Sequence, residues 1–182
     1  MEIESEHKLN LGCGNDIREG WVNLDIAPLP GVDVVHNLEE LPLPFEDEEF
    51  DHIRAQDILE HLEYIPLLKE IHRILKPGGT ISIRVPHFTS RYNFNDPTHK
   101  KMFSSKTMDF FVQGASYGRD YYFDFHFSEN VYTRIKFEKG LYLYNYLIEP
   151  LMNISKQTRT VYEGTFLSRL FPAGMMEITL KK

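Results

Sequence analysis

Residues 9–16 read LNLGCGND, a short apolar run that ends in two glycines around the only cysteine of the chain. A strand that runs into a Gly-x-Gly turn brings backbone without Cβ atoms to the end of the strand. The next apolar run, WVNLDI (Trp21–Ile26), carries an acidic residue, Asp25, near its end. This order is typical of nucleotide-binding sites, where such a carboxylate accepts hydrogen bonds from ribose hydroxyls. A plain turn between two strands fits the same residues, and the pattern alone leaves both interpretations open.

The loop differs from two common phosphate-binding patterns. A dinucleotide fingerprint has a third glycine three residues after the second, where this chain has Ile17. A P-loop has Gly-Lys followed by Ser or Thr, which LNLGCGND does not contain. The loop therefore disfavours a phosphate-bearing ligand. Chemistry at the Cys13 sulfur is also disfavoured, because no second cysteine can resolve it and no base is adjacent in sequence.

Outward from the loop, the first half of the chain alternates apolar runs with turn residues. Between residues 57 and 76, apolar side chains recur at three- and four-residue steps, which predicts a helix. We expect this helix to begin near an Asp57 N-cap, to kink or divide at Pro66, and to end at 77–79. Apolar strands joined by a long helix indicate a parallel sheet with buried faces, in which ligands bind at the carboxyl ends of the strands. The expected strands span 8–11, 21–26, 32–38, 50–55 and 80–86.

The second half of the chain, after Pro86, is rich in aromatic residues. We expect a short helix over 105–111, a strand within 125–140, broken helices over 141–170 and a last strand in 174–182. No long linker marks a boundary, so the chain is interpreted as one domain, 1–182. Most aromatic side chains are expected in a core, and four tyrosines among polar residues are the candidates for a pocket wall: Tyr92, Tyr117, Tyr121 and Tyr122.

Composition restricts the class of protein. The 182 residues carry a formal net charge of −7, which argues against a sequence-independent grip on nucleic acid. No run approaches the roughly 20 apolar residues of a membrane span, and the acidic start MEIESEHK lacks the features of a signal peptide. A single cysteine suits a reducing compartment. We therefore expect a cytoplasmic protein that binds neither membrane nor nucleic acid.

Four blocks, in order, resemble a known family. LNLGCGND followed by NLDI is similar to motif I and the acidic second-strand end of class I S-adenosylmethionine (SAM) dependent methyltransferases. LPLPFEDEEFDHIRAQDILEHL (41–62) and LKEIHRILKPGGTISIRVP (68–86) resemble the fourth- and fifth-strand blocks of the type 11 methyltransferase domain. A small subgroup of that family shares DPTH (96–99) and a terminal strand after Phe-Pro-Ala. The resemblance is dense over 9–86 and looser beyond.

The resemblance implies an α/β, Rossmann-like fold. Its sheet would have seven mainly parallel strands, an antiparallel last strand and helices on both faces. Only ten residues separate Gly14 from Asp25, so the first helix would be shortened or absent. Residues 8–86 would form the cofactor-binding half, and 87–182 would supply the loops, helices and final strands on the acceptor side.

The resemblance also assigns the cofactor and the residues that would contact it. Glycine-loop residues would line the methionine and ribose part of SAM, and Asp25 would hold the ribose hydroxyls. Ile26 would pack on the adenine, residues 37 and 38 would meet its edge, and Gln56 would face the methionine moiety. Many relatives have Asp at the position of Asn37, although an amide can also donate and accept. The full predicted set is Leu11, Gly12, Cys13, Gly14, Asp25, Ile26, Asn37, Leu38 and Gln56.

Three residues near the expected acceptor site are candidates for catalysis. His87 follows the fifth strand, and Asp96 and His99 lie in the NDPTH segment. An imidazole there could act as a general base near neutral pH. Alternatively, Asp96 forms a turn to which His99 is merely paired. These residues and His126 lack a recognised ligand spacing, so no metal is predicted. Glu60 and His61 are expected to fasten the helix near the cofactor.

The sequence thus predicts an enzyme that transfers a methyl group from SAM to a small or saccharide-like acceptor. Two alternatives remain within the same resemblance: a SAM-binding module without turnover, and a methyltransferase that acts on a protein. An NAD-dependent oxidoreductase is disfavoured by Ile17 and by the short first connection.

Overall fold

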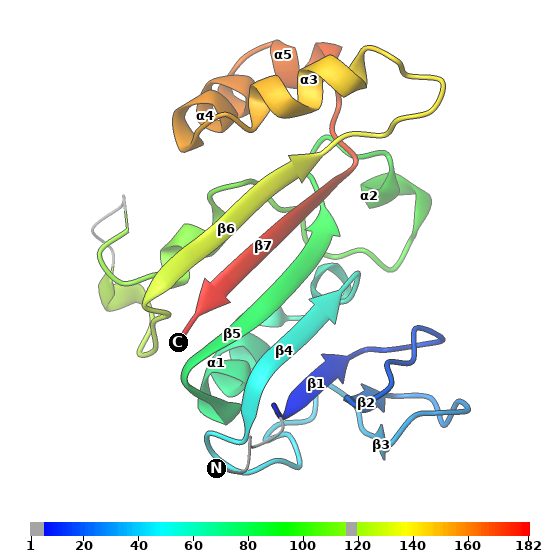
Figure 1. Cartoon of the computed structure of the whole chain (residues 1–182), viewed down its shortest axis with the longest axis vertical. Coiled ribbons are helices and arrows are strands. Elements are labelled where there is room, and N and C mark those ends of the chain that lie inside the picture. Colours follow the sequence, from blue (N-terminus) through cyan, green and yellow to red (C-terminus); the bar gives the residue numbers. More distant parts are fainter. Residues whose placement is uncertain (1–5, 116–119) are drawn as a thin grey trace.

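The computed structural model describes residues 6–115 and 120–182, so Tyr117 lies outside the described residues. Seven strands form one sheet in the order β3-β2-β1-β4-β5-β7-β6 (Figure 1). All described pairs are parallel except those of β7, which runs antiparallel to both β5 and β6. The predicted Rossmann-like sheet with an antiparallel last strand is confirmed. The strands are β1 (Lys8–Leu11), β2 (Val22–Asp25), β3 (Val34–Val35), β4 (Phe50–Gln56), β5 (Leu75–Pro86), β6 (Glu129–Lys136) and β7 (Met175–Lys181).

One face of the sheet carries the main core. Register pairs Leu9 with Ile53, Ile53 with Ile81, and Ile81 with Leu180, so these side chains share a face, and all are fully buried. Helix α1 (Tyr64–Ile74) contributes Leu67, Leu68, Ile71 and Ile74 to the same core. Of the apolar stripe that predicts this helix, Leu68 and Ile71 lie on the buried face, whereas Ile65 is 39% exposed and Leu75 belongs to β5.

The opposite face of the sheet is polar. Its central row runs from Asn10 through Arg54 and Ser82 to Thr179, and a second row includes His52 and Thr80. Most of these side chains on β4, β5 and β7 are only half-buried. The expectation of buried faces therefore holds on this side for Asn10 and Arg54, but not for the half-buried Ser82 and Thr179. The reason is local: residues 12–21 form turns and contain no helix, so only single side chains of that connection, such as Asp16 and Trp21, contact this face.

Residues 12–21 form turns where a helix is usual, and polar side chains hold these turns against the sheet. Arg54 donates to Asn10 Oδ1 at 2.8 Å and to Asp16 Oδ2 at 2.6 Å. Asn10 Nδ2 donates to the Asp16 carbonyl at 2.8 Å. Asn23 accepts from the Arg18 amide at 2.9 Å and donates to the Arg18 carbonyl at 3.0 Å. Strands β1, β2 and β4 thus each supply one side chain that fixes the loop.

The predicted long helix is divided, but not in the way expected. A 3-10 turn, η1 (Leu59–His61), precedes α1, and Pro66 lies in the first turn of α1, where proline is tolerated. Asp57 is not an N-cap: its backbone has φ +55° and its carboxylate pairs with Arg84. Helix α1 ends at Ile74, three residues before Pro77, because β5 begins at Leu75.

The remaining elements belong to residues 87–182, which the sequence analysis assigns to the acceptor side. Figure 1 shows α3 (Asn145–Met152), α4 (Lys156–Gly164) and α5 (Leu167–Leu170) gathered beyond one end of β6 and β7. They enclose a second, small core of Ile135, Phe137, Tyr162 and Ala173. In the described residues between β5 and β6, the helices are short turns: α2 (Tyr92–Asn95), η2 (Thr107–Phe111) and η3 (Asp120–Tyr122).

Among the described residues, no helix is long and apolar enough to cross a membrane.

The Arg54 network gives a first prediction. Replacing Arg54 with Met should lower the free energy of unfolding by about 2 kcal/mol, because Asn10 Oδ1 is left buried without its donor. Urea unfolding followed by circular dichroism measures this. Arg18→Met is the matched control, since Arg18 reaches the same Asp16 at 3.7 Å from a position 39% exposed, and it should cost less than about 0.5 kcal/mol. Equal losses would contradict the role given to Arg54.

Candidate functional site

The two glycines of the loop have different neighbours. Gly12 has φ +60°, and a Cβ there would lie 2.8 Å from Ile58 Cγ1. Gly14 has φ +49°, and a Cβ there would meet nothing within 4 Å. Gly12 is therefore required for packing against the chain itself, whereas Gly14 borders open space at the end of β1.

Asp25 lies directly against this loop. Its Oδ2 accepts from the Gly14 amide at 2.7 Å, and its Oδ1 accepts from the Ala27 amide at 3.0 Å. A carboxylate offers about four acceptor positions, so both oxygens keep capacity for a ligand's hydroxyls. The expected meeting of the glycine turn and the second-strand acid is thus present in the structure.

Other predicted cofactor residues differ in what their side chains can reach. Leu11 and Leu38 are buried in the main core, so only their backbone can face a ligand. Ile26 is 66% exposed beside Asp25 and is free to cover an apolar group. Asn37 accepts from the Glu39 amide at 3.0 Å and donates to Glu40 at 3.3 Å, in a surface turn.

Cys13 and Gln56 are both engaged with the protein. Burial, and next the charge of Asp25, raise the pKa of the Cys13 thiol, which keeps it protonated. This agrees with the sequence analysis, which disfavours chemistry at the Cys13 sulfur. Gln56 Oε1 accepts from Arg54, so its side chain belongs to the network under the loop.

A cavity of about 780 Å³ lies at the carboxyl ends of β4 and β5. Most of the residues that line it carry polar side chains, and it joins residues after β4 to the NDPTH segment. Asp96 and His99 both line it, as the sequence predicts for an acceptor site. The lining residues are Asp57, Glu60, His61, Arg84, Pro86, Tyr92, Asn95, Asp96, Pro97, His99 and Met175.

Within this cavity, Glu60, His61 and His99 form one cluster. One ligand atom of each residue lies within 4.8 Å of those of the other two. The His61 and His99 rings meet edge to face, with centroids 4.6 Å apart. Burial raises the pKa of Glu60 to about 7, and its Oε2 has no hydrogen-bond partner among residues 6–115 and 120–182. Sequence reasoning gave Glu60 and His61 only a fastening role, because nothing local shows that His99 folds back onto them.

Asp96 combines a turn with a place in the cavity. Its Oδ1 accepts from the Thr98 amide at 2.8 Å and from the Thr98 hydroxyl at 2.6 Å, and hydrogen bonds from Thr98 lower its pKa. Its Oδ2 lies 3.9 Å from His99 Nε2. The NDPTH segment therefore forms the alternative turn, and this turn lines the cavity, while a catalytic role for Asp96 and His99 stays a prediction.

His87 does not lie in the open mouth, which corrects its predicted placement. Its side chain is fully buried. Its Nδ1 lies 2.7 Å from Thr89 Oγ1, and its Nε2 lies 3.1 Å from Glu163 Oε1. Glu163, on α4, also accepts from the amide and the hydroxyl of Ser105 at 2.7 and 2.9 Å. His87 thus ties the end of β5 to α4 and has no access to a substrate.

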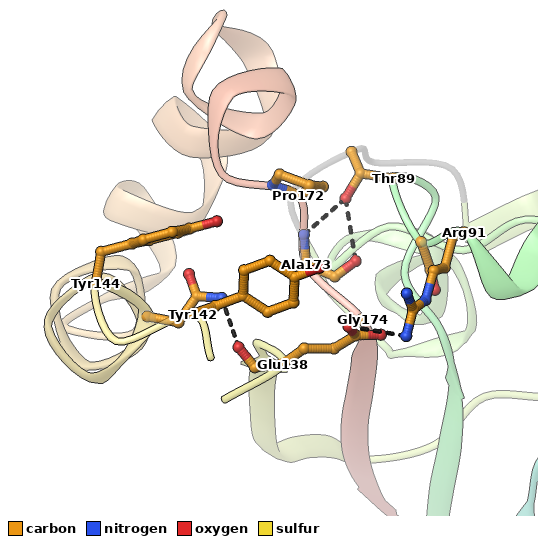
Figure 2. A pocket seen from close by; sticks show the side chains of 10 residues that line it. Thr89, Arg91, Glu138, Tyr142, Tyr144, Pro172, Ala173 and Gly174 are labelled. Atoms are coloured by element: carbon orange, nitrogen blue, oxygen red, sulfur yellow. Dashed lines mark hydrogen bonds and ion pairs between the residues drawn. The ribbon is translucent and has the colours of Figure 1, made fainter. Parts of the chain in front are cut away.

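A smaller cavity of about 220 Å³ lies on the other side of the segment that follows β5. Figure 2 shows Tyr142 and Tyr144 on one wall and Arg91 on the other, with Glu138 paired to Arg91 at 3.2 Å. Thr89 closes its base through contacts with the Ala173 backbone (Figure 2). This cavity holds none of the predicted site residues. Of the candidate tyrosines, Tyr92 lines the larger cavity, whereas Tyr121 and Tyr122 lie beside the start of α1.

Comparison with known proteins agrees with this geometry. Residues 13–83 match the family model described as "Methyltransferase domain". The demethylmenaquinone methyltransferase of Lysinibacillus sphaericus is 35% identical over 57 residues, which are 31% of this chain and 24% of that protein. The sterol 4-C-methyltransferase strm-1 of Caenorhabditis elegans is 32% identical over 128 residues, 54% of this chain and 36% of that protein. The chain therefore spans about a quarter to a third of the length of these relatives.

Solved structures match nearly the whole chain. A SAM-dependent methyltransferase from Archaeoglobus fulgidus superposes with a TM-score of 0.60 at 21% identity, covering 98% of this chain and 87% of that one. A putative sarcosine dimethylglycine methyltransferase from Galdieria sulphuraria gives 0.59 at 17% identity, covering 98% and 78%. At these identities the likeness shows the fold.

The glycine turn gives a second prediction. Gly12→Ala should lower the free energy of unfolding by about 2 kcal/mol or more, since it adds a clash with Ile58 to the cost of a left-handed backbone. Gly20→Ala is the control, because Gly20 has φ +75° but open space around a Cβ, and about 1 kcal/mol is expected. Chemical denaturation compares the two. A Gly12 variant no less stable than the Gly20 variant would refute the packing role.

Glu60 gives a third prediction, on pH. The unfolded chain releases this proton near pH 4.5, while the native chain holds it to about 7, so native stability falls as pH rises through this window. The loss is on the order of 3 kcal/mol. Glu60→Gln removes this titrating group. The free energy of unfolding of the variant, relative to that of the wild type, should therefore rise from pH 5 to 7.5 in metal-free buffer. A difference that stays constant across this range would show that Glu60 titrates normally.

Proposed function

We propose that the chain is a class I SAM-dependent methyltransferase and that it transfers the methyl group of SAM to a small, oxygen-bearing acceptor. One observation carries this proposal: Asp25 and the glycine turn are joined by the 2.7 Å hydrogen bond to Gly14, beside space that the protein leaves open. A ribose diol fits this arrangement, because it needs acceptor oxygens close to backbone that has no Cβ.

The described residues fit SAM as the cofactor. Asp25 retains acceptor capacity for two hydroxyls, and the exposed side chain of Ile26 offers an apolar surface next to it. Gly12, Cys13 and Gly14 would present backbone to the methionine and ribose part. Asn37 and the backbone of Leu38 would meet the adenine edge. When bound, SAM supplies a methyl carbon that is already electrophilic, so the protein's task is alignment and exclusion of water.

The acceptor is argued from the cavity. The relatives with named acceptors share only 24% and 36% of their length with this chain, so their names are weak evidence for the acceptor of this chain. The cavity at the ends of β4 and β5 carries Asp57, Arg84, Asp96 and the two histidines, which suits a polar molecule with oxygen groups. A saccharide-like compound is one such molecule. Asp96 and His99 are the residues proposed to contact this acceptor.

A SAM-binding module without turnover is the second candidate, and a methyltransferase acting on a protein is the third. Turnover separates the first two. Purified protein incubated with SAM and pools of small polar acceptors should release S-adenosylhomocysteine only when an acceptor is present. Release with unfolded peptides but not with small molecules would favour a protein acceptor. No release with any pool would favour the binding module.

The cofactor site gives a fourth prediction. Calorimetry should detect micromolar binding of SAM and of S-adenosylhomocysteine to the wild type. Asp25→Ala should weaken both by about 1–3 kcal/mol, because the ligand's hydroxyls lose charged acceptors. Asp124→Ala, at an exposed site paired to Lys69, is the control and should bind as the wild type does. A wild-type protein that binds neither compound would refute the cofactor assignment.

A further inference from the structure

We propose that Glu60, His61 and His99 bind a first-row divalent transition-metal ion at the wall of the 780 Å³ cavity, with an open coordination position facing the acceptor. The metal site itself does not depend on the proposed methyl transfer. Only the role given to the ion, on the acceptor, rests on that function.

The donor set is the first reason. Two imidazoles and one carboxylate are ligands that zinc and iron sites use when they keep positions open for substrate. The three ligand atoms lie within 4.8 Å of one another. Ligands around a single cation at ~2.1 Å stand about 3.4 Å apart, so a modest contraction of the cluster completes the site.

Unpartnered buried atoms are the second reason. Glu60 is 1% exposed, and its Oε2 has no hydrogen-bond partner in the described structure. His99 has a side chain only 8% exposed, and its Nδ1 has no partner there either. A buried polar atom without a partner costs free energy comparable to a lost hydrogen bond, and one ligand shared by these two residues would remove both costs.

The tautomer of His61 is the third reason. The Thr98 hydroxyl donates its only proton to Asp96 Oδ1, at 2.6 Å. Its contact with His61 Nδ1, at 2.8 Å, must then be one in which the ring nitrogen donates. Nδ1 of His61 therefore carries the proton, and Nε2 keeps its lone pair. Carboxylate-linked chains of this kind orient the histidine ligands of metal sites.

The ion would assist the transfer as a Lewis acid. A hydroxyl oxygen of the acceptor next to the cation has a lowered pKa, so its proton leaves to solvent at neutral pH. The oxygen then forms a bond to the methyl carbon of SAM, the bond from that carbon to sulfur breaks, and its electron pair stays on sulfur. The acceptor class this implies is a hydroxyl compound that can reach both the ion and the cofactor.

Metal binding to the chelator-stripped, full-length protein tests the proposal. Calorimetry with Zn²⁺ should give one site with a micromolar or lower Kd. His99→Gln and Glu60→Gln should each weaken it at least 100-fold. Thr98→Val, which removes only the hydroxyl that fixes His61, should weaken it about 10- to 100-fold. His52→Gln, at a histidine bonded to Thr80 on the polar face of the sheet, is the matched control and should stay within threefold.

Co²⁺ provides a second measurement on the same proteins. The wild type should develop the visible absorption bands of a four- or five-coordinate site, and His99→Gln should lose them while its thermal unfolding shows that it is folded. Failure of the wild type to bind one equivalent of Zn²⁺ would overturn the proposal. Equal weakening by His99→Gln and His52→Gln would overturn it as well.

The test also separates this inference from the proposed function. Asp25→Ala should lose SAM affinity and keep Zn²⁺ affinity, whereas Glu60→Gln should do the reverse. Zn²⁺ binding in a wild type that does not bind SAM would support the metal site and refute the methyl transfer. SAM binding without Zn²⁺ binding would support the cofactor assignment and refute the metal site.

Discussion

The buried guanidinium of Arg54 holds the glycine loop on the sheet, and the rest of the cofactor site depends on that loop. Arg54 reaches across β1 to bond Asn10 and Asp16, and it also bonds Gln56 on its own strand. A helix would normally fix such a connection by packing apolar side chains on the sheet. Here hydrogen bonds between few, mostly buried groups do the same work, so the loop is short and one face of the sheet stays polar.

The parts of the fold that could be predicted are those that depend on neighbours in sequence. The strands were found because apolar residues and glycines mark them, and α1 was found because its buried face repeats at three- and four-residue steps. The polar face was missed because Arg54 and Asn10 lie inside apolar runs, where their pairing across 44 positions leaves no local signal. Asp57 was assigned to a cap for the same reason, since its partner Arg84 is on β5.

The histidines show why the candidate site could be predicted only in part. His87 and His99 were both placed at the acceptor mouth, since both lie near the end of β5 in sequence. Burial separates them: His87 is enclosed by Glu163 from α4, and His99 borders the cavity. Neither Glu163, 76 positions away, nor the contact of His99 with His61 has a sequence pattern that predicts it. A polar residue near the carboxyl end of a strand is therefore weak evidence for a catalytic role until the burial of its side chain is known.

One stretch, residues 54–61, connects the two halves of the site. Arg54 fixes the glycine loop, and Ile58 fills the space that Gly12 leaves for lack of a Cβ. Asp57 has φ +55° and pairs with Arg84, and Glu60 and His61 after it line the cavity. The same eight residues, in β4 and directly after it, thus contact the glycine loop and line part of the cavity. Because interiors are close-packed, the contact of Ile58 with the glycine turn fixes where this segment starts, and Glu60 follows only two residues later.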